Sequence, residues 1–362
     1  RSSAFICGFI CFLGDAIIMT DAKPDPGFGK IFTPHMLLQN YRNGVWETPK
    51  IVKYGPFKLN PATVVFHYGQ EIFEGFKAYR QPDGSVCLFR PERNLARFNH
   101  SAERLCMATI DITSILAWIT KLIKKDKEQI PERPHTLYIR PCMFGADQAV
   151  KVSPSSSYIF FTIISIVGDY FGGDNPLGVR LRTEIEYTRA ASGGTGCAKC
   201  GGNYAASLAA QKQASKEGFD QVIWLDAREH QYVEEMGGMN IMFVLDDKLI
   251  TPSLSGGTIL PGITRDSLLQ LAESKGCKTE ERPISCAELI AAYRAGRLKE
   301  AFACGTAAVI TPIREIVHCG EVLYKNTGDK PGELTMQLRR QLMDLQFGVA
   351  PDPFGWRYPI KL

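Results

Sequence analysis

The 362-residue sequence lacks the features that mark several large classes of protein. No run of Lys and Arg is longer than two residues, and 42 basic residues face 38 acidic ones, which gives a formal net charge of +4. This mild balance leaves no basic footprint, so we expect no nucleic-acid partner. Apart from a short N-terminal run, no segment approaches the roughly 18 apolar residues of a membrane-spanning helix. We therefore expect no membrane partner.

The eleven cysteines do not form the pattern of a small disulfide-stabilised protein, because they are scattered and odd in number. We expect most of the thiols to be reduced, in a cytoplasmic setting. Cys197 and Cys200 form a Cys-x-x-Cys pair, but no second Cys/His pair accompanies them, so no metal site is predicted. The pair leaves two alternatives open: an oxidant-sensitive disulfide, or two small apolar fillers.

Composition divides the chain into four parts. Residues 1–24 contain an apolar run and are predicted to be an N-terminal extension, either not native or disordered. A translation start at Met19, a targeting segment and a structural strand all stay open for it. A segment rich in Gly, Asp and Pro, 168–178, is predicted to be an interdomain loop. It separates a small α/β domain, 25–167, from a large α/β domain, 179–362.

Hydrophobic periodicity predicts an α/β (α+β) fold in which helices surround mixed sheets. Strands are expected at 85–90, 136–145, 157–167, 179–185, 221–226 and 301–313, and a hairpin at 241–252 turning near Asp246 and Asp247. Helices are expected at 91–107, 114–125, 203–217, 265–275, 286–297 and 335–347. Ser285 and Glu288 form a capping box at the start of one of them.

One lysine, Lys199, lies in the glycine-rich segment GGTGCAKCGGNY, 193–204. The segment fits neither a P-loop nor the G-x-G-x-x-G pattern. Glycines allow the backbone to approach a flat or phosphorylated ligand closely, and small neighbours can strip water from the amine. Desolvation favours the neutral, nucleophilic amine that a Schiff-base lysine requires. An exposed loop lysine is the alternative that this segment alone leaves open.

Three other segments offer partners for such a ligand. An acid in VEEMGGMN, 233–240, would keep a pyridine nitrogen protonated, or belongs to a solvated turn. In LPGITRDSLL, 260–269, Thr264 is expected to be the N-cap of a helix whose N–H groups face an anion, or that is simply well capped. ACGTAA, 303–308, offers further N–H donors.

Two arginines complete the set of candidate residues. Arg90 and Arg140 are expected in or at the end of strands, where a buried guanidinium requires an anionic partner. That partner is either a ligand or a structural carboxylate. Taken together, the amine, the acid and the anion donors are the components of a pyridoxal-phosphate site.

In their order and spacing these motifs resemble the branched-chain amino acid aminotransferases, a family of fold-type IV pyridoxal-phosphate enzymes. The resemblance covers roughly residues 25–362, and EEMGGMNI and ACGTAAVITP are most similar to bacterial, particularly actinobacterial, forms. The segments that carry it are FHYGQEIFEGFKAY (66–79), LFRP (88–91), LYIRP (137–141), the lysine segment, EMGGMN (235–240), LPGITR (260–265) and GTA (305–307).

The resemblance implies a two-domain, homodimeric transaminase that uses pyridoxal 5′-phosphate. It implies reversible, ping-pong transfer of the amino group of L-leucine, L-isoleucine or L-valine to 2-oxoglutarate. Which of these donors is preferred, and whether the role is biosynthetic or catabolic, stays open. A D-amino-acid aminotransferase or an aminodeoxychorismate lyase of the same fold is the alternative. A non-catalytic redox or metal-binding protein is a more distant one.

The resemblance also implies a role for each site residue. Lys199 carries the cofactor and moves the proton, Glu235 pairs with the ring nitrogen, and Glu234 is its solvated neighbour. The other cofactor contacts fall on Tyr204, for the ring oxygen, and on Arg90, Ile263, Thr264 and Thr306, for the phosphate. Thr306 and Ala307 would bind the α-carboxylate of the substrate. Arg140 and the partner subunit's Tyr68 would bind the side-chain carboxylate of glutamate. The apolar pocket would be lined by Phe28, Phe73, Tyr138 and Tyr170.

The sequence departs from the family pattern at two places. Mammalian forms carry Cys-x-x-Cys directly after the G-T-A turn, and Ala308 and Thr311 stand at those positions here. Conversely, Cys197 and Cys200 bracket Lys199, where small or aromatic residues are expected.

Overall fold

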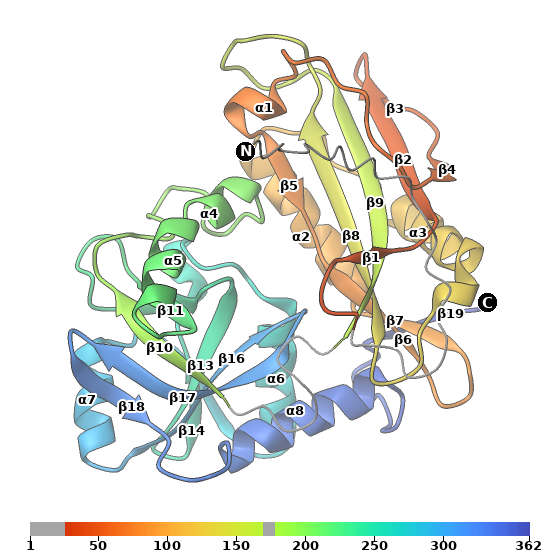
Figure 1. Cartoon of the computed structure of the whole chain (residues 1–362). Coiled ribbons are helices and arrows are strands. Elements are labelled where there is room, and N and C mark those ends of the chain that lie inside the picture. Colours follow the sequence, from red (N-terminus) through yellow and green to blue (C-terminus); the bar gives the residue numbers. More distant parts are fainter. Residues whose placement is uncertain (1–25, 169–177) are drawn as a thin grey trace, which may run out of the picture.

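A computed structural model describes residues 26–168 and 178–362 of the chain. The predicted extension 1–24 and nearly all of the predicted loop 168–178, including Tyr170, lie outside the described residues. Two separate sheets dominate the structure, and helices cover them (Figure 1). No helix within the described residues is long and apolar enough to cross a membrane.

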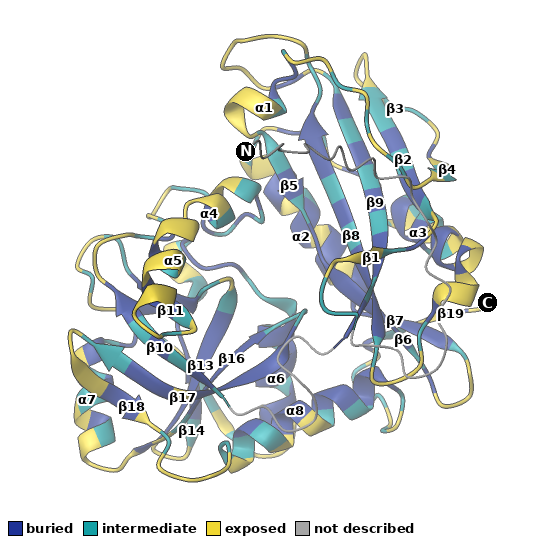
Figure 2. Cartoon of the chain, in the orientation of Figure 1, coloured by how far each residue is buried: buried dark blue, intermediate teal, exposed yellow. Residues whose placement is uncertain are grey.

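The first sheet has ten strands in the order β19-β7-β6-β8-β9-β2-β3, with β1, β4 and β5 paired beside this path. Its strands are β1 (Ile31–Phe32), β2 (His35–Arg42), β3 (Val45–Trp46), β4 (Lys50–Lys53), β5 (Glu71–Phe73), β6 (Phe76–Arg80), β7 (Val86–Phe89), β8 (Thr136–Gly145), β9 (Tyr158–Val167) and β19 (Arg357–Ile360). The helical elements that accompany it are α1 (Val65–Tyr68), α2 (Pro91–Arg104), α3 (Ile112–Lys125) and η1 (Lys127–Gln129). Apolar side chains of α2 and α3 pack with those of the sheet into one buried core. In Figure 2 the strands β6, β7 and β8 are coloured mostly as buried.

The second sheet has nine strands in the order β12-β11-β10-β17-β16-β13-β14-β15, with β18 beside β17. Because β12 also pairs with β13, the strands β12, β11, β10, β17, β16 and β13 form a closed ring. These strands are β10 (Val179–Glu184), β11 (Gln221–Leu225), β12 (Val233–Met236), β13 (Met239–Leu245), β14 (Lys248–Thr251), β15 (Lys278–Glu281), β16 (Leu298–Gly305), β17 (Val309–His318) and β18 (Glu321–Lys325). The helices are α4 (Gly201–Ala205), α5 (Leu208–Lys216), η2 (Leu254–Gly256), α6 (Ile263–Ser274), α7 (Cys286–Arg294) and α8 (Glu333–Gln346).

Most of the predicted elements are confirmed to within a few residues. The predicted turn at Asp246 and Asp247 joins β13 to β14, and both residues have positive φ, as a tight hairpin turn requires. Ser285 Oγ accepts a hydrogen bond from the N–H of Glu288 at the start of α7, as the capping box predicts. The α+β class with two sheets is therefore correct. The second sheet is mixed, because β10 pairs in parallel with β11 and β17, whereas the long strands β8 and β9 of the first sheet pair antiparallel.

Two predictions at the level of elements were wrong, and one strand was not predicted. The single helix expected at 203–217 is divided into α4 and α5, because Ser207 bonds back to the carbonyl of Tyr204 with both its N–H and its hydroxyl. The strand expected at 301–313 is a hairpin of β16 and β17 around the turn after Gly305. The last strand, β19, pairs with β7 of the first sheet, although the sequence placed all of 179–362 in one domain.

Candidate active site

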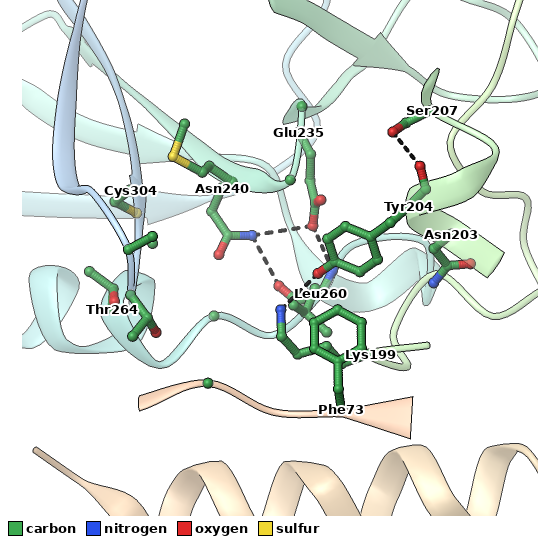
Figure 3. A pocket seen from close by; sticks show the side chains of 18 of the residues that line it. Phe73, Lys199, Asn203, Tyr204, Ser207, Glu235, Asn240, Leu260, Thr264 and Cys304 are labelled. Carbon is green, nitrogen blue, oxygen red and sulfur yellow. Dashed lines mark hydrogen bonds between the residues drawn. The ribbon is translucent and has the colours of Figure 1, made fainter. Parts of the chain in front are cut away.

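A cavity of about 360 Å³ lies between the two sheets (Figure 3). Its wall contains most of the residues that the sequence singled out: Phe28, Phe73, Tyr138, Arg140, Lys199, Tyr204, Glu235, Ile263, Thr264, Thr306 and Ala307. Two predicted residues, Arg90 and Tyr68, do not line it. The fold therefore brings together segments that are up to about 280 residues apart in the sequence.

Lys199 is held by its own backbone and points its amine into the cavity. Its N–H donates to Ser101 Oγ at 2.9 Å on α2, and its carbonyl accepts from the N–H of Phe73 at 3.0 Å on β5. The side-chain Nζ donates to Tyr204 Oη at 2.7 Å and lies 4.9 Å from the centre of the Phe73 ring. Lys199 is thus half-buried, and hydrogen bonds hold both its backbone and its side chain. This rules out the alternative of an exposed loop lysine.

The glycines around Lys199 are required by close packing. A Cβ atom at Gly196 would lie 2.3 Å from the carbonyl oxygen of Thr258, and one at Gly201 would lie 2.4 Å from a carboxylate oxygen of Glu71. Asn203 Nδ2 ties the turn together by donating to backbone carbonyls within the same segment. A side chain at Gly196 would collide with backbone and move the segment, whereas one at Gly201 would displace the carboxylate of Glu71, which accepts from the N–H of Gly201.

Glu235 is the buried acid of the site. It is 1% exposed, and its Oε2 lies 2.8 Å from Nε of Arg189. Its Oε1 accepts from the N–H of Leu260 at 2.7 Å and, more weakly, from Asn240 Nδ2 at 3.4 Å. Burial raises the pKa of the Glu235 carboxyl, and the guanidinium of Arg189 opposes that effect. A carboxylate held in this way suits a cationic N–H partner.

Glu234 was expected to be a solvated neighbour of Glu235, and the structure corrects this prediction. Its side chain is only 7% exposed, and Thr258 Oγ1 bonds its Oε1 at 2.5 Å. The sequence left a solvated turn open as one alternative for 233–240. In the structure these residues lie on β12 and β13, within the closed ring of strands, so both acids are buried.

The N-terminus of α6 faces the cavity. Its N-cap is Gly262 with extended backbone, not Thr264 as predicted, and no side chain caps it. A Cβ at Gly262 would lie 1.9 Å from Asn240 Oδ1, so the chain can enter the helix here only with glycine. Because Ile263 and Thr264 line the cavity, the first-turn N–H groups of this 12-residue helix are available to an anion.

Arg90 lies behind this helix N-terminus. It is the N-cap of α2 with a left-handed backbone, where the sequence analysis expected a strand residue. Its Nη1 is 2.6 Å from Asp266 Oδ2 and donates to Ser267 Oγ at 2.7 Å, and its guanidinium stacks on Trp356. Its anionic partner in this structure is therefore a structural carboxylate of α6.

The opposite wall of the cavity is aromatic and cationic. Arg140 Nη2 donates to Tyr138 Oη at 3.0 Å, and the guanidinium lies 4.6 Å from the centre of the Phe73 ring. The Phe28 ring meets Tyr138 edge-on at 4.9 Å. A Cβ at Gly75 would lie 1.8 Å from Tyr138 Oη, so Gly75 makes room for this wall. Arg140 Nε is buried without a hydrogen-bond partner among the described residues, which leaves it suited to an acceptor from a ligand.

Charged residues that the sequence did not single out hold the walls of the cavity in place. Arg97 binds the fully buried Glu74 through Nε at 2.6 Å and Nη2 at 3.0 Å, and its Nη1 donates to the Pro261 carbonyl before α6. Lys77 Nζ donates to the Ala307 carbonyl at 2.8 Å. Glu74 and Lys77 belong to the motif FEGFKAY. That motif marked them as candidates, but it did not indicate that they bind Arg97 and the carbonyl of Ala307.

The remaining predicted residues lie away from the cavity. Tyr68, at the end of α1, is 40% exposed and lies outside the cavity of its own chain. Cys197 and Cys200 are both free thiols, and the second of them is buried. Within 26–168 and 178–362, no group of three or more His, Cys, Asp or Glu residues is placed to hold a metal ion.

Known proteins share this sequence and this fold. Residues 71–316 match the family model for amino-transferase class IV. The chain is 45% identical over 92% of its length to branched-chain-amino-acid transaminase 1 of Bacillus subtilis, covering 95% of that protein. It is 48% identical, over 92% of its length and 91% of the relative, to the branched-chain-amino-acid aminotransferase of Mycolicibacterium smegmatis.

Solved structures agree with the sequence comparison. The crystal structure of the Escherichia coli branched-chain amino acid aminotransferase superposes with a TM-score of 0.74 at 27% identity, covering 91% of this chain and all of the other. A T.th. branched-chain amino acid aminotransferase with pyridoxamine 5′-phosphate gives a TM-score of 0.73 at 25% identity, over 91% of this chain and all of that one. The chain thus belongs to the class IV aminotransferases and, within them, to the branched-chain-amino-acid aminotransferase family.

Proposed function

We propose that this protein is a pyridoxal-phosphate-dependent branched-chain amino acid aminotransferase. It transfers the amino group of L-leucine, L-isoleucine or L-valine to 2-oxoglutarate, reversibly and in two half-reactions. The observation that carries the proposal is the grouping of Lys199, Tyr204 and Glu235 in one cavity, with the uncapped N-terminus of α6 in the same wall. An amine, a phenol, a buried acid and an anion site are the four contacts that the cofactor requires.

The residues present fit pyridoxal phosphate. Glu235 would bind the ring nitrogen, Tyr204 the ring oxygen, and the first-turn N–H groups of α6 together with Thr306 the phosphate. Arg90 would add charge beside that phosphate through the first turn of α6, where it already contacts Asp266. When bound, the cofactor accepts the amino group and delocalises the electron pair released at the substrate α-carbon.

The chain's own residues would then move one proton and exclude water. Lys199 Nζ would be the base that takes the proton from the substrate α-carbon and holds it for the return transfer. Its bond to Tyr204 Oη keeps the amine oriented, and Phe73 covers it on one side. The backbone bonds of Lys199 to Ser101 and Phe73 keep the amine in place through both half-reactions.

The aromatic and cationic wall of the cavity suits two kinds of side chain. Phe28, Phe73 and Tyr138 offer apolar surface to a leucine, isoleucine or valine side chain. Arg140, stacked on Phe73 and bonded to Tyr138, offers a guanidinium to the second carboxylate of glutamate or 2-oxoglutarate. The N–H groups of Thr306 and Ala307 are the proposed donors to the α-carboxylate that both substrates share.

We further propose a homodimer in which Tyr68 enters the site of the partner subunit. Large apolar side chains are exposed on two adjacent segments: Phe66 and Tyr68 on α1, and Val150 and Val152 in the loop between β8 and β9. The bridge between Thr63 and Gln148 brings these segments together. An apolar patch of this kind is typical of a surface that another chain covers, and a second copy would carry Tyr68 to a site that its own chain does not reach.

The purified protein tests the proposed activity directly. We expect turnover with L-leucine and 2-oxoglutarate, and little with D-alanine or aminodeoxychorismate as donor. Lys199→Ala should abolish turnover while the far-ultraviolet circular dichroism stays unchanged. Higher turnover with D-alanine or aminodeoxychorismate would assign the chain to another reaction of the same fold, and an active Lys199→Ala variant would overturn the role of the lysine.

A further inference from the structure

Glu234 is a buried acid that the proposed reaction does not use. Its Oε1 is bonded to Thr258 Oγ1 at 2.5 Å, and its Oε2 is buried without a hydrogen-bond partner among the described residues. The charged groups that act on it are Glu235 on the same strand, Arg189 before the lysine segment and Asp226 after β11. Burial raises the pKa of Glu234 to about 7, so this carboxyl keeps or loses its proton near neutral pH.

A continuous path of contacts leads from Glu234 to Glu235. Glu234 bonds the hydroxyl of Thr258, and the carbonyl of Thr258 accepts from Arg189 Nη1 at 2.7 Å. Nε of Arg189 in turn lies 2.8 Å from Oε2 of Glu235. Because successive residues of a strand face opposite sides, Glu234 reaches the cavity through Thr258 and Arg189 and not directly. Arg189 also donates to the carbonyl of Gly196, three residues before Lys199.

We propose that Glu234 is a positioning residue that acts on Glu235 through Thr258 and Arg189 and adjusts the charge of the site by holding or releasing one proton. The proposal rests on the assigned role of Glu235 at the cofactor ring nitrogen. With the proton held, the buried guanidinium of Arg189 is balanced by the single carboxylate of Glu235. With the proton released to solvent, a second negative charge stands behind the same guanidinium.

The extra charge has a predictable consequence. It makes the group around Glu235 more negative, and this favours the positive charge on a ring nitrogen bonded to Glu235. It also competes with Glu235 for Arg189, which holds both Thr258 and the lysine segment. A plot of kcat against pH should therefore show a step near neutral pH, caused by the ionisation of Glu234. Glu234 is the neighbour in sequence of Glu235, the acid proposed to bind the cofactor.

The test compares the holoenzyme with three variants. Glu234→Gln has the shape of the protonated acid but cannot ionise, so it should behave at every pH like the native enzyme at low pH. Thr258→Val removes the hydroxyl that joins Glu234 to the path, while its carbonyl still binds Arg189, and Thr258→Ser restores the hydroxyl. Glu229→Gln is the matched control, because it removes one negative charge from the exposed loop after β11, near the same strand.

Three measurements are made on each protein. Infrared spectroscopy follows the protonated carboxyl band, visible absorption of the bound cofactor is titrated with pH, and kcat and KM are measured across neutrality. We expect a carboxyl band that titrates near neutral pH in the native enzyme and is missing in Glu234→Gln. We expect a step in kcat, without a matching step in KM, on the order of threefold. The step and the corresponding change in absorption should be lost in Glu234→Gln. They should move to higher pH in Thr258→Val, because the bond from Thr258 lowers the pKa of Glu234, and stay in place in Thr258→Ser and Glu229→Gln.

Two results would overturn the proposal. One is a native enzyme whose carboxyl band does not titrate near neutral pH. The other is a Glu234→Gln variant whose absorption titration and kcat profile match the native ones. These outcomes differ from a failure of the proposed function, which would appear as activity in Lys199→Ala or as native rates in Glu235→Gln. If Glu234→Gln does not fold, Thr258→Val and Thr258→Ser decide the question by the same readouts.

Discussion

The amine of Lys199 donates to the phenol oxygen of Tyr204 across 2.7 Å, and the Phe73 ring packs against both side chains. This contact orients the amine of the lysine. Tyr204→Phe keeps the ring that packs on Phe73 and removes only the hydroxyl. We expect kcat with L-leucine to fall roughly tenfold to a hundredfold, because a hydrogen bond to a charged group contributes about 1.5–3 kcal/mol.

The visible absorption of the bound cofactor should shift in Tyr204→Phe as well, since the same hydroxyl meets the ring oxygen. Tyr187→Phe is a suitable control, because Tyr187 is exposed and does not line the cavity. Native kcat and absorption in Tyr204→Phe would show that Tyr204 serves only to fill space.

Glu235→Gln tests the acid at the ring nitrogen. The amide keeps the shape of the side chain and the bond from Leu260, so the cofactor should still bind. The activation free energy of the half-reaction with L-leucine should rise by on the order of several kcal/mol, because the ring loses its charged partner. Single-turnover absorption measurements give this rate. If Glu234→Gln slowed the half-reaction more than Glu235→Gln, the two acids would have exchanged roles.

Local pattern was sufficient to predict much of this molecule. The ten residues of β8 and the apolar run of β9 were predicted within one residue, because long runs rich in apolar residues are typical of central strands. Lys199 could be selected because it is the one lysine of a glycine-rich segment, whereas the choice of Glu235 over Glu234 and the role of Thr306 came from the resemblance to a family. The glycines proved informative for a physical reason, since Gly196 and Gly201 each touch atoms that a side chain would displace.

What could not be predicted were contacts between distant segments. Nothing in the sequence near Arg189 indicates that its guanidinium lies against Glu235, 46 residues later in the chain. The burial of Glu234 was missed for the same reason, because a pair of acids before Gly-Gly has the composition of an exposed turn. The division of α4 from α5 depends on one serine hydroxyl, and helix propensity does not report such a bond.

Arg140→Met should separate the two substrates of the enzyme. Arg140 meets a second carboxylate, which glutamate and 2-oxoglutarate have and leucine lacks. We expect kcat/KM for glutamate to fall roughly tenfold to a hundredfold, the effect of about 1.5–3 kcal/mol, and the half-reaction with L-leucine to change far less. Half-reaction rates with each donor, measured separately, make the comparison. An equal loss with both donors would show that Arg140 mainly supports Tyr138 and Phe73.

The pH dependence of stability follows from the buried carboxyl of Glu234. Its pKa is raised from its ordinary value of 4.5 to about 7. Between these values the unfolded chain gives up the proton while the folded chain holds it, so folding becomes less favourable as pH rises. The free energy of unfolding should lose about 1.4 kcal/mol per pH unit from this group, with the full loss present above the folded value.

Glu234→Gln removes this contribution. Urea unfolding of the full chain across this range should show the variant gaining stability relative to the native protein as pH rises, with a constant difference above neutrality. A difference that does not change with pH would mean that Glu234 ionises equally in both states.

Mixing two inactive variants tests whether Tyr68 acts across a subunit interface. Tyr68 is exposed and lies outside the cavity of its own chain, whereas Lys199 lies inside it. In a mixed dimer of Lys199→Ala and Tyr68→Ala chains, one site combines the intact Lys199 of one chain with the intact Tyr68 of the other. Activity with glutamate should therefore return when the two proteins are unfolded, mixed and refolded together.

Up to about half of the dimers would be mixed if the chains pair at random, and each would hold one complete site. Each variant refolded alone is the control. If the mixture stays as inactive as its parts while sedimentation shows dimers, then Tyr68 does not act in the partner's site.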